Sequence, residues 1–304
     1  VKNWAERADQ YDCFYFMADL HAITVRQNPA ELRRRCLELA AIYIASGIDP
    51  KKSLIYCQSH VSGHAELAWI LNCFTYMGEM NRMTQFKDKS AKHADNINCG
   101  LFTYPVLMAG DILLYQANLV PVGKDQKQHL EVTRDLAGKI NDAFGEGLLK
   151  MPEAIISEAT AVVPGLDGQK MSKSYGNTLP IFGEEQPLRK LINKKVVTDA
   201  TPLEAPKPTE NSIILALYKL FATPEQYQAM VDAHHAGGVG YGQFKKDLFE
   251  AYWEYFRTAR ERRDWLLANP GYVDETLNSG AARAREEAAI TLTRVRKAVG
   301  LGWL

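Results

Sequence analysis

Short apolar runs alternate with helical stripes of apolar residues along the first half of the chain. The runs have the length of β-strands and cover residues 13–19, 53–58, 119–122 and 154–156. The stripes recur with helical spacing and cover residues 29–47, 64–76, 104–115 and 126–144. Strands and helices that alternate in this way predict parallel βαβ units. We therefore expect an α/β, Rossmann-like domain with a parallel sheet, and ligands at the carboxyl ends of its strands.

The pattern changes after about Ile181, where prolines interrupt the chain and only helical stripes follow. Pro202, Pro206 and Pro208 punctuate a predicted linker. The expected helices cover residues 211–221, 224–233, 242–268 and 281–299. The expected organisation is therefore an α/β domain, an inserted all-helical domain and a last helix that packs back towards the first domain, over residues 1–181, 182–280 and 281–304.

Composition is typical of a globular protein and provides no net charge that would attract nucleic acid. Hydrophobic residues make up 46% of the 304 residues and charged residues 24%, with 36 basic and 36 acidic side chains. A nucleic-acid surface would therefore have to come from local basic patches. No apolar run approaches the roughly 20 residues of a membrane span. The five cysteines form no Cys-x-x-Cys pair, which is typical of reduced thiols in a cytoplasmic protein.

The loop at residues 163–177 carries the most specific local pattern. Lys170 and Lys173 are three residues apart, with hydroxyls at Ser172 and Ser174. Two ammonium groups, together with hydroxyl and backbone donors, can wrap a polyphosphate. Taken singly, these residues also fit an ordinary surface turn, so the ordered string Lys-Met-Ser-Lys-Ser carries the functional prediction.

Polar side chains also follow the predicted strands. Asp19 and His21 leave the first strand, where a structural histidine fits as well as a functional one. The strand at 119–122 delivers Gly123, and Asp125 and Gln126 then open a helix. A carboxylate there can accept both hydroxyls of a ribose, while the N–H groups of the helix N-terminus face a phosphate.

Two further groups have simpler interpretations. Lys87 and Lys89 lie close together after a helix, where a solvated surface is the alternative to phosphate binding. His60 and His64 are spaced as metal ligands on a helix could be, but no third ligand is evident. We therefore expect no metal site built by the protein.

Six sequence words connect these clusters. They are Asp19-x-His-Ala-x-Thr24, Gln58-Ser-His60, Met83-Thr-Gln-Phe-Lys-x-Lys-Ser90, Tyr104-Pro-x-Leu-Met-Ala-x-Asp-Ile-Leu-Leu-Tyr115, Val120-Pro-Val-Gly-x-Asp-Gln-x-Gln-His129 and Lys170-Met-Ser-Lys-Ser174. Over nearly the whole chain, this set resembles the bacterial-type tryptophanyl-tRNA synthetases of class I. The last word is typical of the class, and the words at Tyr104 and Val120 separate the tryptophan enzymes from the tyrosine enzymes.

The resemblance implies a pocket for L-tryptophan. Asp111 would accept the indole N–H, and Met108 and Val122 would pack against the ring. The residues that would bind the charged ends of the amino acid are Tyr104, Gln126 and His21.

The resemblance also implies an ATP site. Gly123 and Asp125 would hold the ribose. The catalytic residues would be the lysines that meet the phosphates, Lys89, Lys170 and Lys173. The other residues of the ATP loop would be Met171, Ser172 and Ser174.

The chemistry implied by the resemblance has two steps. The carboxylate of tryptophan attacks the α-phosphorus of ATP, and the acyl group then passes to the terminal ribose of tRNA(Trp), bound with the help of the helical domain. Nothing suggests a covalent enzyme nucleophile, so orientation, lysine charge and Mg²⁺ would carry catalysis.

Two departures from the family pattern stand out. Lys124 occupies a position where the family usually has Glu. Residues 1–8 have the pattern of the tail of a helix, whereas family members begin with a strand and a Gly-rich His/Thr-Ile-Gly-Asn-type loop that contacts ATP. We therefore expect a further segment before Val1 in the native protein.

Alternatives to this interpretation remain open. A tyrosyl enzyme shares the chemistry, but a phenol pocket should offer partners for a hydroxyl, and here Asp111 stands between apolar neighbours. The carboxylate of Asp111 could also be a structural group inside its helix. A non-enzymatic paralogue that binds RNA or a partner is a second alternative, which the three retained phosphate lysines disfavour.

We also expect a homodimer, because the segment at residues 64–80 is apolar on more than one face. Its apolar side chains are Leu67, Ala68, Leu71, Phe74, Tyr76, Met77 and Met80. The alternative is a helix buried within a single chain.

Overall fold

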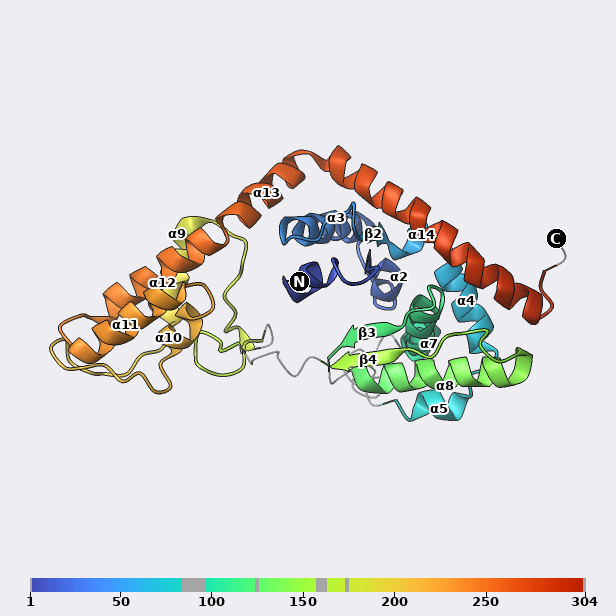
Figure 1. Cartoon of the computed structure of the whole chain (residues 1–304), viewed down its shortest axis with the longest axis horizontal. Helices are drawn as coiled ribbons and strands as arrows, with labels where there is room; N and C mark the ends of the chain where they lie inside the picture. Colours follow the sequence, from blue (N-terminus) through green and yellow to red (C-terminus); the bar gives the residue numbers. More distant parts are fainter. Residues whose placement is uncertain (1, 84–96, 124–125, 157–162, 173–174, 303–304) are drawn as a thin grey trace. The chain divides into compact units, whose positions relative to one another are not determined.

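The computed structural model describes residues 2–83, 97–123, 126–156, 163–172 and 175–302. The chain forms two compact units. Unit 1 comprises Val1–Ser157 and Arg263–Leu304, and unit 2 comprises Glu158–Arg262. Figure 1 shows the helices and strands of both units.

Parallel strand pairs form the centre of unit 1. Strand β1 (Phe14–Met17) pairs with β2 (Leu54–Cys57), and β3 (Leu119–Val122) pairs with β4 (Glu153–Ile156). Both pairings are parallel, as the βαβ pattern predicts. The described strands form two separate two-stranded sheets. The predicted α/β, Rossmann-like fold is confirmed.

Helices surround these strands. The N-terminal elements are α1 (Lys2–Arg7), α2 (Asp19–Ala22), α3 (Pro29–Ala45), the 3-10 turn η1 (Gln58–His60), α4 (Gly63–Asn72) and α5 (Met77–Asn81). The later ones are α7 (Cys99–Leu113), α8 (Lys127–Phe144) and α14 (Pro270–Ala298). Local sequence sets their starts: at α3, the Asn28 side chain accepts a hydrogen bond from the Glu31 N–H, and Pro29 occupies the first turn. No described helix has the length and hydropathy needed to span a bilayer.

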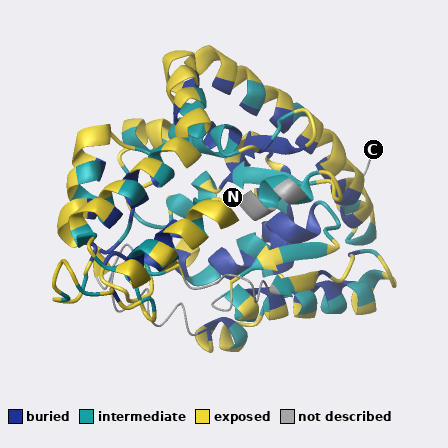
Figure 2. Ribbon diagram, turned by 60° about the vertical axis from the view of Figure 1, so that its left-hand side comes forward, coloured by how far each residue is buried: buried dark blue, intermediate teal, exposed yellow. Residues whose placement is uncertain are grey.

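Helix α14 covers the β1–β2 pair. Its buried positions recur at helical spacing along one side (Figure 2), which produces the alternation of dark blue and yellow along the ribbon. Gly280 lies against β2 so closely that a Cβ there would stand 2.1 Å from the Ile55 carbonyl oxygen. Ala281, Ala284 and Ala288 continue this small-residue contact with the core.

Unit 2 is all-helical apart from its loops. It contains α9 (Glu185–Lys195), α10 (Ile213–Tyr218), α11 (Pro224–Ala236) and α12 (Tyr241–Tyr255). Its core includes Ile192, Leu217, Phe249 and Tyr252. Lys207 is buried, and its ammonium donates to three backbone carbonyls, those of Pro202, Leu203 and Ala205. The predicted linker therefore folds around a lysine rather than remaining an open tether.

Two expectations about helices are wrong, and one further helix was not predicted. The last helix begins at Pro270, before residue 281, because Val273 and Leu277 already pack into the core of unit 1. The single helix expected at 242–268 is two helices, α12 and α13 (Arg257–Ala268), separated at Phe256. Helix α9 was not predicted. Its two buried residues, Leu188 and Ile192, form a stripe too short to be recognised among prolines.

The unit boundaries also differ from the expected ones at 181 and 280. Leu166 and Leu179 pack into the core of unit 2, so the loop before residue 181 belongs to the helical unit. Residues 263–280 belong to unit 1, because Leu266 and Val273 are part of its core.

Candidate active site

A buried carboxylate, Asp111, lies at the centre of the site in unit 1. Asp111 is 6% exposed and lies near the C-terminal end of α7. Its Oδ2 atom is 2.8 Å from His21 Nε2. Its Oδ1 atom is 2.7 Å from His64 Nδ1 and accepts a hydrogen bond of 2.6 Å from Gln58 Nε2.

The strand ends explain why these partners converge on α7. His21 lies in α2, which follows β1, and Gln58 opens η1, which follows β2. Because β1 and β2 are parallel neighbours, their carboxyl ends deliver both side chains to the same edge. Asp19 links the two ends, since its carboxylate accepts hydrogen bonds from the Ser59 hydroxyl and from the Ser59 N–H at 2.9 Å.

The electrostatic balance keeps Asp111 ionised. Burial acts to raise the pKa of the carboxyl group, but the hydrogen bonds from His21 and His64 outweigh it and hold the pKa below its usual value. An ionised carboxylate only accepts hydrogen bonds, so the site offers a buried acceptor for an N–H donor.

The predicted tryptophan-binding residues of α7 share one face. Tyr104, Met108 and Asp111 follow each other at spacings of four and three residues, which places them on the same side of the helix. The Tyr104 hydroxyl is 3.0 Å from His129 Nε2, and burial raises the pKa of Tyr104 to about 12. The His21 and Tyr104 rings lie 6.3 Å apart, so His21, Tyr104 and Asp111 form one cluster.

The other predicted residues of unit 1 follow β3. Val122 ends this strand and Gly123 comes next, exposed, while Gln126 is the N-cap of α8. They thus lie at the carboxyl end of a parallel strand, as predicted. Asp125 and Lys89 lie outside the described residues, as does Lys124.

The Lys170 loop belongs to unit 2. Lys170 pairs with Pro164 in an antiparallel bridge, and the Met171 N–H donates to the Val163 carbonyl at 3.0 Å. The side chain of Met171 packs against the core of unit 2. Lys173 and Ser174 lie outside the described residues. The structure thus assigns the predicted tryptophan residues to one unit and the Lys170 loop to the other.

Asn177 organises the described part of this loop. Its Oδ1 accepts from the Ser172 N–H at 2.8 Å, and its Nδ2 donates to Asp167 Oδ1 at 2.8 Å and to the Lys170 carbonyl at 3.2 Å. The hydrogen bond from Asn177 is the main reason that the pKa of Asp167 lies below its usual value. Gly165 leaves room for this amide, because a Cβ at that position would stand 2.2 Å from Asn177 Nδ2.

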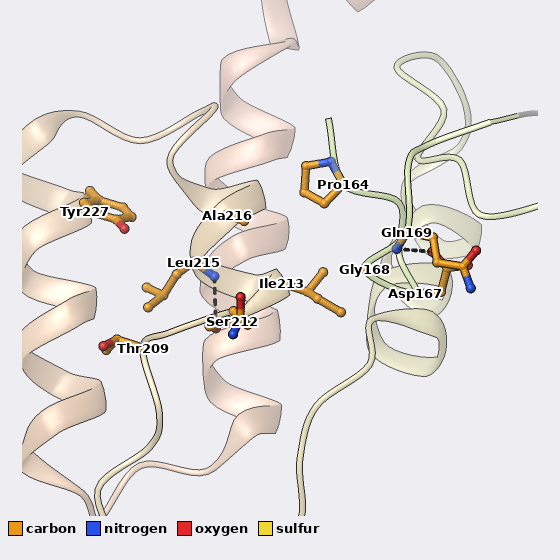
Figure 3. Close-up of a pocket in the computed structure, with 11 residues that line it drawn as sticks. Pro164, Asp167, Gly168, Gln169, Thr209, Ser212, Ile213, Leu215, Ala216 and Tyr227 are labelled. Carbon is orange, nitrogen blue, oxygen red and sulfur yellow. Dashed lines mark hydrogen bonds between the residues drawn. The ribbon is translucent and has the colours of Figure 1, made fainter. Parts of the chain in front are cut away.

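A pocket of about 610 Å³ lies beside the base of the loop, within unit 2 (Figure 3). Pro164, Asp167, Gly168 and Gln169 form its loop side. Ile213 and its neighbours at the start of α10 form the facing side. None of the six predicted tryptophan-binding residues lines it.

His64 and Asn177 were not predicted as site residues, and Gln58 was part of a recognised sequence word without being given a role. Gln58 stands directly after a buried strand, which is a signal that could have identified it. His64 was considered only as a metal ligand with His60. In the described part of the chain, no group of three His, Cys, Asp or Glu side chains is placed to hold a metal ion.

Comparisons with known proteins assign the chain to a family. Residues 1–257 match the sequence profile of the family described as tRNA synthetases class I (W and Y). The chain belongs to this family.

The most similar relatives include two bacterial proteins named tryptophan–tRNA ligase. That of Fusobacterium nucleatum is 44% identical over 301 residues, which span 99% of this chain and 92% of that protein. That of Rhodopirellula baltica is 45% identical, over 99% and 93% of the two chains. A crystal structure of the Campylobacter jejuni tryptophanyl-tRNA synthetase complexed with ADP and tryptophan matches with a TM-score of 0.94 and 43% identity, over 99% of this chain and 93% of that one.

Proposed function

We propose that this chain is a tryptophan–tRNA ligase, which activates L-tryptophan with ATP and transfers it to the 3′ end of tRNA(Trp). Family membership and the two relatives named for this activity support the proposal. The observation that carries it is the buried, ionised Asp111 on the same helix face as Tyr104 and Met108.

The donors that the described residues supply to Asp111 leave room for one more. A carboxylate has about four acceptor positions. Two are used on Oδ1, by Gln58 and His64, and one on Oδ2, by His21. The remaining position on Oδ2 suits the indole N–H, a donor without acceptor lone pairs. A phenol would also bring an acceptor oxygen that needs its own donor, so this environment favours tryptophan over tyrosine.

The first step forms tryptophanyl-adenylate. A carboxylate oxygen of tryptophan attacks the α-phosphorus, the bond from that phosphorus to the bridging oxygen breaks, and pyrophosphate leaves. Tyr104, Gln126 and His21 would orient the amino acid, and Gly123 and Asp125 the ribose. Lys89, Lys170 and Lys173 would meet the charge that develops on pyrophosphate, with Met171, Ser172 and Ser174 completing the ATP loop.

The second step transfers the amino acid to tRNA. A hydroxyl of the terminal ribose attacks the carbonyl carbon of the adenylate, and AMP leaves. We assign tRNA binding chiefly to the helical unit. Mg²⁺ would neutralise phosphate charge, and it would be held mainly by ATP, because the described residues offer no group of three ligands for it.

We also propose that the protein acts as a homodimer. Leu67, Leu71 and Met80 are buried within the chain, yet Tyr76 and Met77 on the same segment are 69% and 68% exposed. Trp69 adds a third large exposed apolar side chain, at 70%. Trp69, Tyr76 and Met77 lie close together along the chain, and we propose that they contribute to one apolar surface, since such surfaces commonly mark a contact with a partner chain.

Amino-acid-dependent exchange of pyrophosphate into ATP tests the proposed function. We expect exchange that depends on tryptophan and is at least about 10²-fold weaker with tyrosine. Stronger exchange with tyrosine would make the protein a tyrosyl enzyme. RNA binding without exchange by any amino acid would instead favour a non-enzymatic paralogue.

A further inference from the structure

A histidine that sequence reasoning did not place in the site lies behind Asp111. The His64 side chain is fully buried on α4. Its Nδ1 is 2.7 Å from Asp111 Oδ1, while its Nε2 is 3.0 Å from the Tyr115 hydroxyl and 3.3 Å from the Tyr56 hydroxyl. The imidazole ring is therefore held from both sides.

The chemistry of the partners determines the direction of these hydrogen bonds. Asp111 is ionised and has no proton to donate, so His64 Nδ1 carries a proton and donates it to Oδ1. Burial raises the pKa of both Tyr56 and Tyr115, so their hydroxyls remain protonated and can donate to Nε2. The two phenols thus favour the form of the ring in which Nδ1 holds the hydrogen.

This arrangement distinguishes the two oxygens of Asp111. Oδ1 is occupied by two donors, His64 and Gln58, which are both fully buried. Oδ2 meets His21, whose side chain is 21% exposed, so this oxygen lies on the accessible side of the carboxylate. Holding Oδ1 therefore determines where Oδ2 presents its remaining acceptor position.

We propose that His64 is a positioning residue for amino-acid selection. By holding Oδ1, it orients Asp111 so that Oδ2 receives the indole N–H, and it acts without touching the substrate. This inference rests on the proposed function and deepens it. A ring that only fills space would contribute to stability and leave the choice of amino acid unchanged.

Two substitutions separate the contacts of the ring. In His64→Asn, the side-chain amide nitrogen can occupy roughly the place of Nδ1, so the hydrogen bond to Asp111 is retained. In His64→Gln, the longer side chain reaches the place of Nε2 and the tyrosines, and the donor to Oδ1 is lost. Both variants are neutral and polar, and they serve as matched controls for each other.

The measurement is pyrophosphate exchange with tryptophan and with β-(benzothiophen-3-yl)alanine, in which sulfur replaces the indole N–H. We expect His64→Gln to raise the KM for tryptophan about tenfold or more, since a hydrogen bond to a charged group is lost. The KM values for the analogue and for ATP should stay within about threefold of wild type. His64→Asn should keep both amino-acid KM values within about threefold.

The ratio of the two amino-acid KM values decides the outcome. The positioning role would be overturned if His64→Gln left the ratio of the tryptophan KM to the analogue KM unchanged, or if both variants raised that ratio equally. The role would also be overturned if His64→Gln changed the KM values for tryptophan and for the analogue in parallel and lowered the unfolding temperature. A ring with only a structural role would produce that result. A wild-type protein without tryptophan-dependent exchange would instead contradict the proposed function, and this result is seen before any variant is compared.

Discussion

Asp111 illustrates how a buried charge is stabilised by residues far away in sequence. A carboxylate withdrawn from water is costly unless donors replace its hydration. Here the donors come from α2, η1 and α4, and the pKa of Asp111 lies below its usual value. Among the described residues, the donors that make the charge tolerable leave one acceptor position for a ligand.

Asp111→Asn should weaken tryptophan selection without disturbing ATP. The asparagine oxygen can keep the hydrogen bonds from Gln58 and His64, while its amide donates where Oδ2 accepted. The indole N–H then faces a donor. We expect the KM for tryptophan to rise about 10²-fold and the preference over tyrosine to narrow. Unchanged discrimination in exchange assays would mean that the indole is recognised elsewhere.

The same residue predicts a dependence of stability on pH. The pKa of Asp111 is lower in the folded than in the unfolded protein, so the unfolded state binds more protons on acidification. The stabilisation from its charge is complete above about pH 4, the ordinary value for Asp, and is lost as the pH falls through the folded pKa. Urea unfolding of wild type and Asp111→Asn should therefore show a difference in free energy that is largest near neutral pH. A difference that grows below pH 4 would contradict this.

Lys170→Ala should slow adenylate formation and spare tryptophan binding. Loss of a charge placed at developing pyrophosphate should cost about 3 kcal/mol in the transition state, roughly a hundredfold in rate. Pre-steady-state adenylation and tryptophan binding are measured together. The matched control is Lys190→Ala, which removes an exposed lysine of the same unit. Collapse of tryptophan binding with a normal adenylation rate would contradict the assignment.

At the scale of elements, the long helix α14 holds unit 1 together. It lies beside β2, α3 and α4, although it is the last helix of the chain (Figure 1). Small residues make this possible, since Gly280 brings the helix backbone against the Ile55 carbonyl. The contact is therefore sensitive to a single methyl group.

Gly280→Ala should destabilise the protein by about 3 kcal/mol, because the new Cβ meets backbone atoms that cannot move aside. The control is Gly271→Ala on the same helix, where no atom lies within 4 Å of the added Cβ. Gly271→Ala should leave the free energy of unfolding unchanged or raise it by up to about 1 kcal/mol, because alanine favours a helix. Urea unfolding of both variants measures the effect. Equal free energies of unfolding for the two variants would contradict the prediction, because they would show that α14 can shift away from β2 without loss of stability.

At the scale of the whole molecule, association should depend on the surface formed by Trp69, Tyr76 and Met77. We expect sedimentation to show a dimer at micromolar concentration, and Trp69→Glu to shift it to the monomer by burying a charge at the interface. Ile290→Glu is the control, since Ile290 is a large apolar residue exposed to a similar extent, 60%, on α14. A monomeric wild type would contradict the dimer, and dissociation by the control alone would place the interface on another surface.

Much of the architecture could be predicted because it depends on local pattern. Three of the four described strands lie within the predicted runs, β4 begins one residue before its predicted run, and α8 begins within one residue of the predicted start. Apolar runs and stripes report burial directly, so these elements follow from the sequence. The start of α14 was predicted too late. Residues 270–280 place only Val273 and Leu277 in the core, among small and polar residues, so no long apolar stripe marks this part of the helix.

The sequence by itself determined the types of elements, the Lys-Met-Ser-Lys-Ser loop and the candidate status of Asp111, His21 and Tyr104. Only the tertiary structure decided how Asp111 is held. Its donors His21, Gln58 and His64 are 90, 53 and 47 residues away along the chain. No local pattern records such contacts. They arise when parallel strands deliver their carboxyl ends to one edge and a buried helix packs across it.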